Sequence, residues 1–130
     1  MPVFSDTSRK RLETCDPRLQ RLFSEVIKHF DCSVLCGHRG EAAQNEAFRS
    51  GTSTKRWPAS KHNILPSIAV DVAPYPIRWD DIDRFRYFAG FVMGVAAQMG
   101  IKIRSGGDWD MDTDLHDQNL IDLPHFELSE

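Results

Sequence analysis

Apolar residues recur at intervals of three and four in two long stretches of the chain. The first stretch starts at Asp16-Pro17, which combines an N-cap residue with a proline at the first helical position. Its apolar positions are Leu19, Leu22, Phe23, Val26, Ile27 and Phe30. The second stretch spans residues 80–99, and Gly100 supplies a C-terminal stop. This spacing predicts two amphipathic helices as the main helices of the fold.

Shorter segments predict strands and one further helix. Strand-like apolar patterns cover residues 33–36, 68–73, 101–104 and 124–128, and residues 41–49 have a helical pattern closed by Gly51. Residues 52–66 and the Asp-rich residues 106–119 show no clear period and are predicted as loops. The mixture favours an α+β fold with a small antiparallel sheet. At 130 residues the chain fits one compact domain, residues 1–130.

Composition and charge exclude several classes of protein. Hydrophobic residues make up 41% and charged residues 27%, which is typical of a folded globular chain. The net charge is −3 and the basic residues are scattered, so no nucleic-acid partner is expected. The longest apolar run, residues 88–97, is too short to span a bilayer, and residues 1–12 lack the apolar stretch of a secretory signal. We therefore expect no membrane insertion and synthesis as a cytoplasmic product.

The cysteines offer one candidate metal site. Their odd number, three, argues against a disulfide framework and for reduced thiols. Cys32 and Cys36 stand near His29 and His38, and such Cys/His groups can bind structural zinc. In a strand, however, residues four apart are separated by roughly 13 Å. Zinc–sulfur bonds of about 2.3 Å do not span that distance, so we favour buried thiols that act as small hydrophobes.

A second candidate site lies near the predicted strands. Asp71 stands between Val70 and Val72, where an unpaired carboxylate is costly to bury. The charge would be compensated by a metal ion or by an arginine partner. Alternatively, Asp71 is partly exposed on an edge strand. His125 and Glu127 alternate with apolar neighbours, so they share one face of the last strand.

His62 and Asp122 can complete this second site. A catalytic zinc takes three protein ligands from His, Asp, Glu or Cys and keeps one position for water. A carboxylate beside that water acts as general base, and Asp122 can fill this role if it folds back toward His125. The alternative is a lone histidine on a terminal strand that follows a turn-forming aspartate.

Three short motifs, in this order, resemble a family of zinc peptidases. They are Ser60-Lys61-His62, Ala69-Val70-Asp71 and residues 122–127, and Gly37-His38-Arg39 with Gln44 resembles the family's preceding Gly-x-Arg segment. The family includes D-alanyl-D-alanine carboxypeptidases and phage L-alanyl-D-glutamate endopeptidases. The spacer, residues 63–68, lacks the usual glycine, and Asp122 stands where carboxypeptidases generally have glutamate. Both departures favour the phage endolysin branch.

The resemblance implies a ligand set and a base. One Zn²⁺ per chain would be held by His62, Asp71 and His125. Asp122 would take the proton of the attacking water and later protonate the leaving amine.

The resemblance also implies roles for three residues outside the ligand set. Arg39 would polarise the scissile carbonyl or stabilise the oxyanion, the alternative being a surface arginine that caps a turn. Ser60 and Gln44 would bind substrate. Their alternatives are a turn-capping serine and a structural hydrogen-bonding glutamine.

The function that the resemblance implies is hydrolysis of a peptide bond in the stem peptide of peptidoglycan. The favoured bond is L-alanyl-D-glutamate, cut by a phage or prophage endolysin. The alternatives are a D-Ala-D-Ala carboxypeptidase and a non-catalytic wall-binding or virion module, for which the acid Asp122 has no use. We expect a monomer made in the bacterial host cytoplasm without a signal peptide, which acts on the cell wall after release.

Two further features bear on ligands. Asp108, Asp110, Asp112 and Asp114 alternate in the manner of a Ca²⁺ loop, but the stretch lacks the glycine and the closing glutamate of an EF-hand. A hydrated acidic loop is therefore favoured over a Ca²⁺ site. Trp57, Trp79 and Trp109 lie in or beside predicted loops, where a tryptophan either stacks on a glycan or peptide or, more often, acts as a partly buried anchor.

Overall fold

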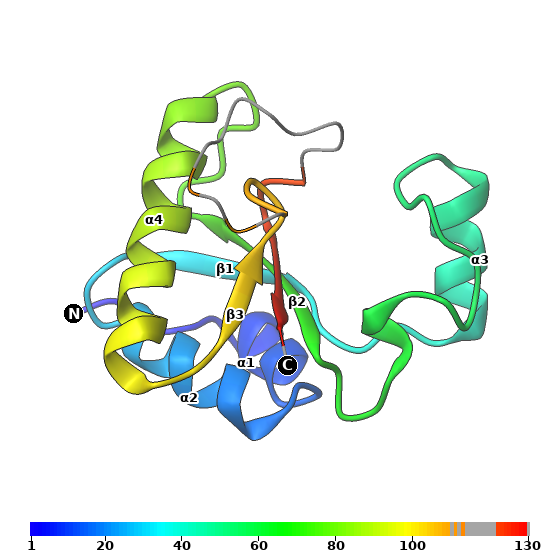
Figure 1. Cartoon of the computed structure of the whole chain (residues 1–130), viewed down its shortest axis with the longest axis horizontal. Coiled ribbons are helices and arrows are strands. Elements are labelled where there is room, and N and C mark those ends of the chain that lie inside the picture. The colour runs from blue at the N-terminus through cyan, green and yellow to red at the C-terminus, as the bar shows by residue number, and fades with distance from the viewer. Residues whose placement is uncertain (110, 112, 114–121, 130) are drawn as a thin grey trace.

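Short alternating segments form a four-stranded antiparallel sheet. The computed structural model describes residues 1–109, 111, 113 and 122–129. Strands β1 (Cys32–Cys36), β2 (Ala69–Pro74), β3 (Ile103–Ser105) and β4 (His125–Leu128) pair in the order β1-β2-β4-β3 (Figure 1). The last strand therefore lies inside the sheet, between β2 and β3, and its residues have neighbours on both sides.

One face of the sheet is covered by three helices: α1 (Asp6–Leu12), α2 (Pro17–Val26) and α4 (Ile82–Met99) (Figure 1). The rings of Phe23 and Phe88 lie 5.5 Å and 6.2 Å from the ring of Phe126 on β4. The main core comprises, among others, Leu12, Leu19, Leu22, Phe23, Val26, Val34, Val70, Val72, Phe88, Val92, Ile103 and Phe126. Burial of this apolar face is the main stabilising contribution to the fold.

Aspartate side chains cap the N-termini of the two long helices, and a glycine ends α4. The carboxylate of Asp16 accepts a hydrogen bond from the backbone N–H of Arg18 at 2.9 Å, and that of Asp81 accepts one from Arg84 at 3.1 Å. Gly100 ends α4 with φ of 72°, a left-handed conformation that glycine adopts without steric cost.

Helix α3 (Glu41–Arg49) and the 3-10 helix η1 (Lys61–Asn63) lie beside the sheet, beyond the end of β1 (Figure 1). Gln44 is the buried residue of α3, and its side-chain oxygen accepts a hydrogen bond from the Asn63 amide at 3.1 Å. This contact ties α3 to the loop that carries His62.

The structure confirms the α+β class and the antiparallel sheet. Both long helices, the helix at residues 41–49 and all four strands occur, with ends shifted by at most a few residues. Helix α2 ends at Val26 rather than near Phe30, and α1 was not predicted. Helix α1 buries only Ser8 and Leu12, so its sequence shows no apolar period. The described residues thus form the three predicted helices and, in addition, α1.

Two predictions about particular segments have different outcomes. Within the described part of the chain, no helix is both long and apolar enough to cross a membrane. Asp110, Asp112 and Asp114 of the acidic loop lie outside the described residues, so the preference for a hydrated loop over a Ca²⁺ site stays a prediction.

The sheet face opposite Val72 and Phe126 carries polar residues. Because side chains alternate along a strand, Asp71 on β2 and His125 and Glu127 on β4 point to this face. His125 and Glu127 are only 8% and 4% exposed. Buried ionisable groups need partners, and the partners of these residues define the candidate site.

Candidate metal centre

Cys36, Asp71 and His125 form a row across three neighbouring strands. Asp71 pairs with Cys36 on β1 and with His125 on β4, and directly opposed residues share a face of the sheet. The register of β1 shifts between Val34 and Cys36 at a β-bulge or similar irregularity, so Cys36, rather than Leu35, stands opposite Asp71. The sequence pattern of β1 does not predict this shift.

His62 reaches the row from η1. Its backbone N–H donates to the Ser60 hydroxyl at 3.2 Å, which caps η1. Its ring Nδ1 lies 2.7 Å from the carbonyl oxygen of Gly37. Nδ1 therefore donates its proton to this carbonyl, and Nε2 is the nitrogen left to bind a metal ion. Gly37 is required here, since a Cβ would overlap the carbonyl of Arg11 and the hydroxyl of Thr14.

His125 is held in the opposite tautomer. Its Nε2 lies 2.8 Å from the Glu127 carboxylate and donates to it. Its Nδ1 lies 3.1 Å from Oδ1 of Asp71. When Nε2 carries the proton, Nδ1 is the nitrogen available to a metal ion.

The two available imidazole nitrogens converge on Asp71. His62 Nε2 lies 3.3 Å and His125 Nδ1 3.1 Å from the same carboxylate oxygen, Oδ1. Ligand atoms about 2.0–2.1 Å from a tetrahedral zinc lie about 3.3 Å apart, so both spacings fit ligands of one ion. His62 Nε2 is buried and has no hydrogen-bond partner among the described residues. A buried ring nitrogen without a hydrogen-bond partner favours a bound metal ion at this position.

Among the residues that the structure describes, two groups of three potential ligands share Asp71. One consists of Cys36, His62 and Asp71, the other of Asp71, Asp122 and His125, and within each group the ligand atoms lie within 4.8 Å of one another. Imidazole, carboxylate and thiolate together suit zinc and its first-row neighbours better than calcium or magnesium. The residues present therefore fit a transition-type metal ion.

The charges in this cluster are strongly coupled. Burial by itself lowers the pKa of His62, but Asp71 and Cys36 outweigh burial and raise this pKa to about 10. Burial acts in the opposite sense on Asp71, yet His125 and His62 hold the pKa of its carboxyl well below the usual range. At neutral pH the metal-free cluster thus combines an anionic Asp71 with a protonated His62, and a metal ion must displace that proton.

Asp122 lies at the edge of the cluster. Its Oδ2 is 3.9 Å from His125 Nδ1, and its side chain is 44% exposed. Burial and the negative charge of Asp71 raise the pKa of Asp122, which makes it a better proton acceptor than an ordinary aspartate. Gly106 allows its close approach, because a Cβ at Gly106 would overlap the Asp122 carbonyl.

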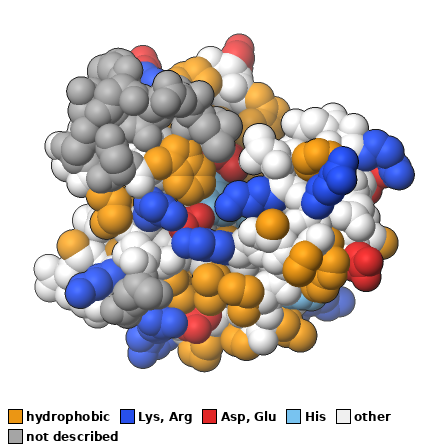
Figure 2. All heavy atoms as spheres, turned by 45° about the vertical axis from the view of Figure 1, so that its right-hand side comes forward, with side chains coloured by type: hydrophobic (Ala, Val, Ile, Leu, Met, Phe, Trp, Pro, Cys, Tyr) orange, Lys and Arg blue, Asp and Glu red, His pale blue; other side chains and the backbone are white. Residues whose placement is uncertain are grey.

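Arg39 lies on the other side of Asp71. Its Nη2 is 3.7 Å from Asp71 Oδ2 and its Nη1 donates to the Gln44 side chain at 3.0 Å. Gln44 is fully buried, and its amide nitrogen donates in turn to Ser53 at 2.9 Å. The guanidinium is therefore fixed from behind by α3. Figure 2 shows Lys and Arg side chains gathered around a recess in which acidic and histidine atoms are visible.

Glu127 links the centre to two basic side chains. Its Oε2 accepts hydrogen bonds from Lys61 Nζ at 2.7 Å and Arg104 Nη2 at 2.5 Å. Burial would raise its pKa, but His125, Lys61 and Arg104 outweigh burial and hold the Glu127 pKa well below its usual range. The ionised Glu127 therefore orients His125 and increases the basicity of its Nδ1.

We expect Glu127→Gln to weaken metal affinity by about 10- to 100-fold, as is typical for outer partners of a ligating histidine. The amide removes the negative charge behind His125 and cannot satisfy Lys61 and Arg104 in the same way. Competition titration with a metal-binding dye measures the effect. The exposed Glu41→Gln on α3 is the control, and equal affinities for the two variants would contradict this role.

Five of the predicted site residues lie together at the centre, and the other two are buried behind it. His62, Asp71, His125 and Asp122 come together, and Arg39 adjoins them through Asp71. Ser60 is 9% and Gln44 0% exposed, and both are held by internal hydrogen bonds.

Sequence reasoning grouped the cysteines differently from the structure. Cys36 lies with His62 and Asp71, whereas His29, Cys32 and His38 belong to no potential ligand group within the described residues. Burial raises the pKa of Cys32 to about 12, which suits the predicted role of a small hydrophobe. The strand pattern placed Cys36 correctly on β1, but its partners come from sheet pairing, which local sequence does not encode.

An α+β sheet that carries a candidate His/Asp/Cys metal site beside a carboxylate and an arginine fits the class of hydrolases that use a metal ion. A model of the phage L-alanyl-D-glutamate peptidase family matches residues 2–129. The L-alanyl-D-glutamate peptidase of Escherichia phage T5 is 31% identical over 133 residues, which cover 96% of each chain. The crystal structure of the Serratia marcescens L-Ala D-Glu endopeptidase ChiX aligns with a TM-score of 0.74 and 28% identity, over 98% of this chain and 90% of that one.

The chain belongs to the phage L-alanyl-D-glutamate peptidase family. It is therefore a peptidase of the peptidoglycan stem peptide, of the phage type. The family and the activity predicted from the ordered motifs are both confirmed.

Proposed function

We propose that this peptidase works with one zinc ion per chain, held by His62 Nε2, Asp71 and His125 Nδ1. The convergence of two available imidazole nitrogens on one Asp71 oxygen carries the assignment. Cys36 stays outside the ligand set, because its sulfur already contacts Arg39 Nη2 at 3.6 Å. A fourth protein ligand would also take the position that a catalytic zinc keeps for water.

A bound zinc ion would supply a water of lowered pKa, about 7, and a Lewis acid for the scissile carbonyl. Asp122 takes the proton of the attacking water and delivers it to the leaving amine, and its raised pKa suits both transfers. Arg39 donates to the carbonyl oxygen as negative charge develops on it.

Ser60 and Gln44 act as positioning residues in this mechanism. Ser60 fixes the backbone of His62 by capping η1. Gln44 fixes the guanidinium of Arg39. Their burial supports these roles in place of direct substrate contact.

Product analysis tests the proposed activity against its rivals. With purified stem peptide and zinc-loaded protein, mass spectrometry should show cleavage between L-Ala and D-Glu. Loss of one terminal D-Ala would instead identify a carboxypeptidase. Intact peptide together with an inactive zymogram on purified walls would identify a binding module. We further propose that the protein acts as a monomer on the cell wall after release from the host cytoplasm, and light scattering on the zinc-loaded protein tests the monomer.

A further inference from the structure

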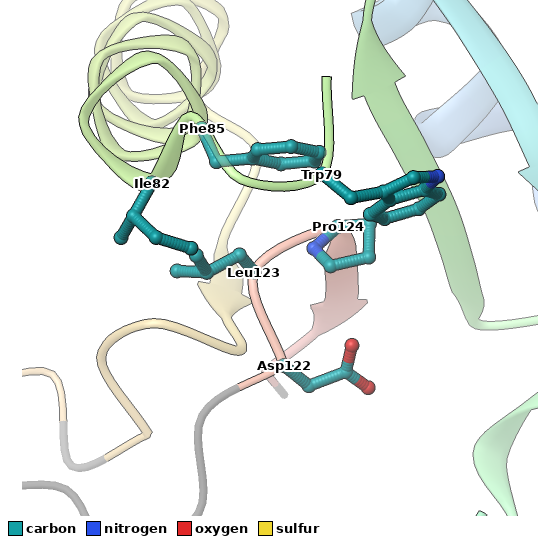
Figure 3. Close-up of a pocket in the computed structure, with 6 residues that line it drawn as sticks. All are labelled: Trp79, Ile82, Phe85, Asp122, Leu123 and Pro124. Carbon is teal, nitrogen blue, oxygen red and sulfur yellow. The ribbon is translucent and has the colours of Figure 1, made fainter. Parts of the chain in front are cut away.

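An apolar pocket adjoins Asp122. It has a volume of about 330 Å³ and is lined by Trp79, Ile82, Phe85, Asp122, Leu123 and Pro124 (Figure 3). The rings of Trp79 and Phe85 lie at one end of this group and the carboxylate of Asp122 at the other. Because Asp122 Oδ2 is 3.9 Å from His125 Nδ1, the pocket opens beside the proposed site of bond cleavage.

Trp79 presents a large apolar surface in this pocket. Its side chain remains 60% exposed although its ring stacks on Phe85, with centroids 5.4 Å apart and 19° between the planes. The stacking partner holds the indole in place. An aromatic face carries partial negative charge, so it attracts the partly positive C–H groups of a flat apolar ligand surface such as a sugar ring.

Charge indicates which side of the substrate the pocket accepts. Asp122 is the one ionisable group among the lining residues. Beyond the scissile bond, D-glutamate carries a free α-carboxylate, since the stem continues through its γ-carboxyl group, and the lining of this pocket offers that charge no cationic partner. The nearby cationic side chains do not line this pocket. Arg39 contacts Asp71, and Arg104 contacts Glu127.

The other side of the scissile bond is uncharged and short. It consists of L-alanine, whose amine is joined through a lactyl group to the N-acetylmuramic acid of the glycan. One residue spans at most about 3.6 Å of extended chain. The sugar therefore follows the scissile bond closely enough to enter a pocket that begins at Asp122.

We propose that this pocket binds the N-acetylmuramyl sugar of the substrate, with its ring packed on Trp79. The inference rests on the proposed function, because it requires cleavage next to L-alanine. It assigns to Trp79 a specificity for stem peptides that are still attached to the glycan.

Two soluble substrates test the assignment. One is a stem tetrapeptide that carries N-acetylmuramic acid, and the other is the same peptide with a plain N-acetyl group, so both are uncharged at that end. We expect wild-type protein to prefer the muramyl peptide by about tenfold in kcat/KM, equivalent to about 1.4 kcal/mol. Trp79→Ala should bring this ratio close to one. Tyr87→Ala removes an exposed aromatic ring of α4 that does not line the pocket, and it should keep the wild-type ratio.

A wild-type ratio near one, or an equal loss on both substrates in Trp79→Ala, would overturn the proposal. Cleavage of neither substrate between L-Ala and D-Glu would instead refute the proposed function. Calorimetric binding to zinc-loaded Asp122→Asn protein, with and without Trp79→Ala, tests the pocket without catalysis. There the muramyl peptide should bind more tightly only when Trp79 is present, and equal binding in both proteins would also overturn the proposal.

Discussion

Replacing Asp122 with asparagine lowers the rate of stem-peptide hydrolysis at least about a hundredfold and leaves metal content and thermal unfolding nearly unchanged. General acid–base groups contribute about 10²- to 10⁴-fold to a rate. Asparagine keeps the shape of the side chain but accepts no proton from the attacking water. The side chain is 44% exposed and lies at the edge of the cluster, so its loss of charge disturbs neither the core nor the contact between His62 and Asp71.

The measurement combines kcat on purified stem peptide, metal analysis and a melting curve. Asp83→Asn, which removes an exposed carboxylate from the first turn of α4, is the charge-matched control and should retain the wild-type rate. If Asp122→Asn loses its metal, Asp122 is a ligand, as the group Asp71, Asp122 and His125 would allow. If it keeps both metal and rate, the base lies elsewhere. Glu127 would be a poor substitute, because three side chains already occupy its oxygens.

Asp71 and His125 could be singled out from local sequence, whereas the ligand role of His62 and the base role of Asp122 were predicted from the family motifs. An aspartate inside the apolar run 69–73 and a histidine that shares a strand face with a glutamate both require partners when buried. The order of these motifs along the chain then indicated the family. Alternation predicted that His125 and Glu127 share one face of the last strand, and the apolar run 69–73 predicted a strand that contains Asp71. The structure confirms both.

The geometry of the centre depends on contacts that sequence does not show. Which ring nitrogen of His62 is available follows from the carbonyl of Gly37, 25 residues away in sequence. The presence of Cys36 beside Asp71 follows from a register shift in β1. Both are tertiary effects, as is the burial of Gln44 of α3 against Asn63 of η1. The short helix α1 escaped prediction for a different reason: it is stabilised by packing on β1 and by a Ser5 cap rather than by an apolar period.

Replacing either ligating histidine should abolish hydrolysis by removing the metal. Both His62→Ala and His125→Ala delete one of three ligands, and Asp71 then keeps only the other histidine and Arg39 as partners. We expect less than about a tenth of the wild-type metal content after dialysis and an equally large loss of rate, because a zinc site with two protein ligands is rarely retained. His29→Ala removes an exposed histidine that contacts Glu25 at 3.4 Å, away from the centre, and it should behave as wild type.

The thiol Cys36 separates the two possible ligand sets. If His62, Asp71 and His125 hold the ion, Cys36→Ser retains the metal and His125→Ala loses it. If Cys36, His62 and Asp71 hold it, the two variants exchange these outcomes. The absorption spectrum of the cobalt-substituted protein tests independently whether Cys36 is a ligand. A thiolate ligand would add a charge-transfer absorption that Cys36→Ser removes, and we expect wild-type cobalt protein to lack it.

The pH dependence of metal binding checks the same ligands without mutation. In the metal-free protein the pKa of His62 is raised to about 10, so at neutral pH its imidazole binds a proton that the ion must displace. Affinity should therefore rise with pH, by about tenfold per pH unit for each displaced proton, throughout the range below that pKa. Calorimetry in buffers of different ionisation enthalpy should count at least one proton released per ion at pH 7. Release of no proton, with an affinity that does not change between pH 6 and pH 8, would exclude His62 from the ligand set.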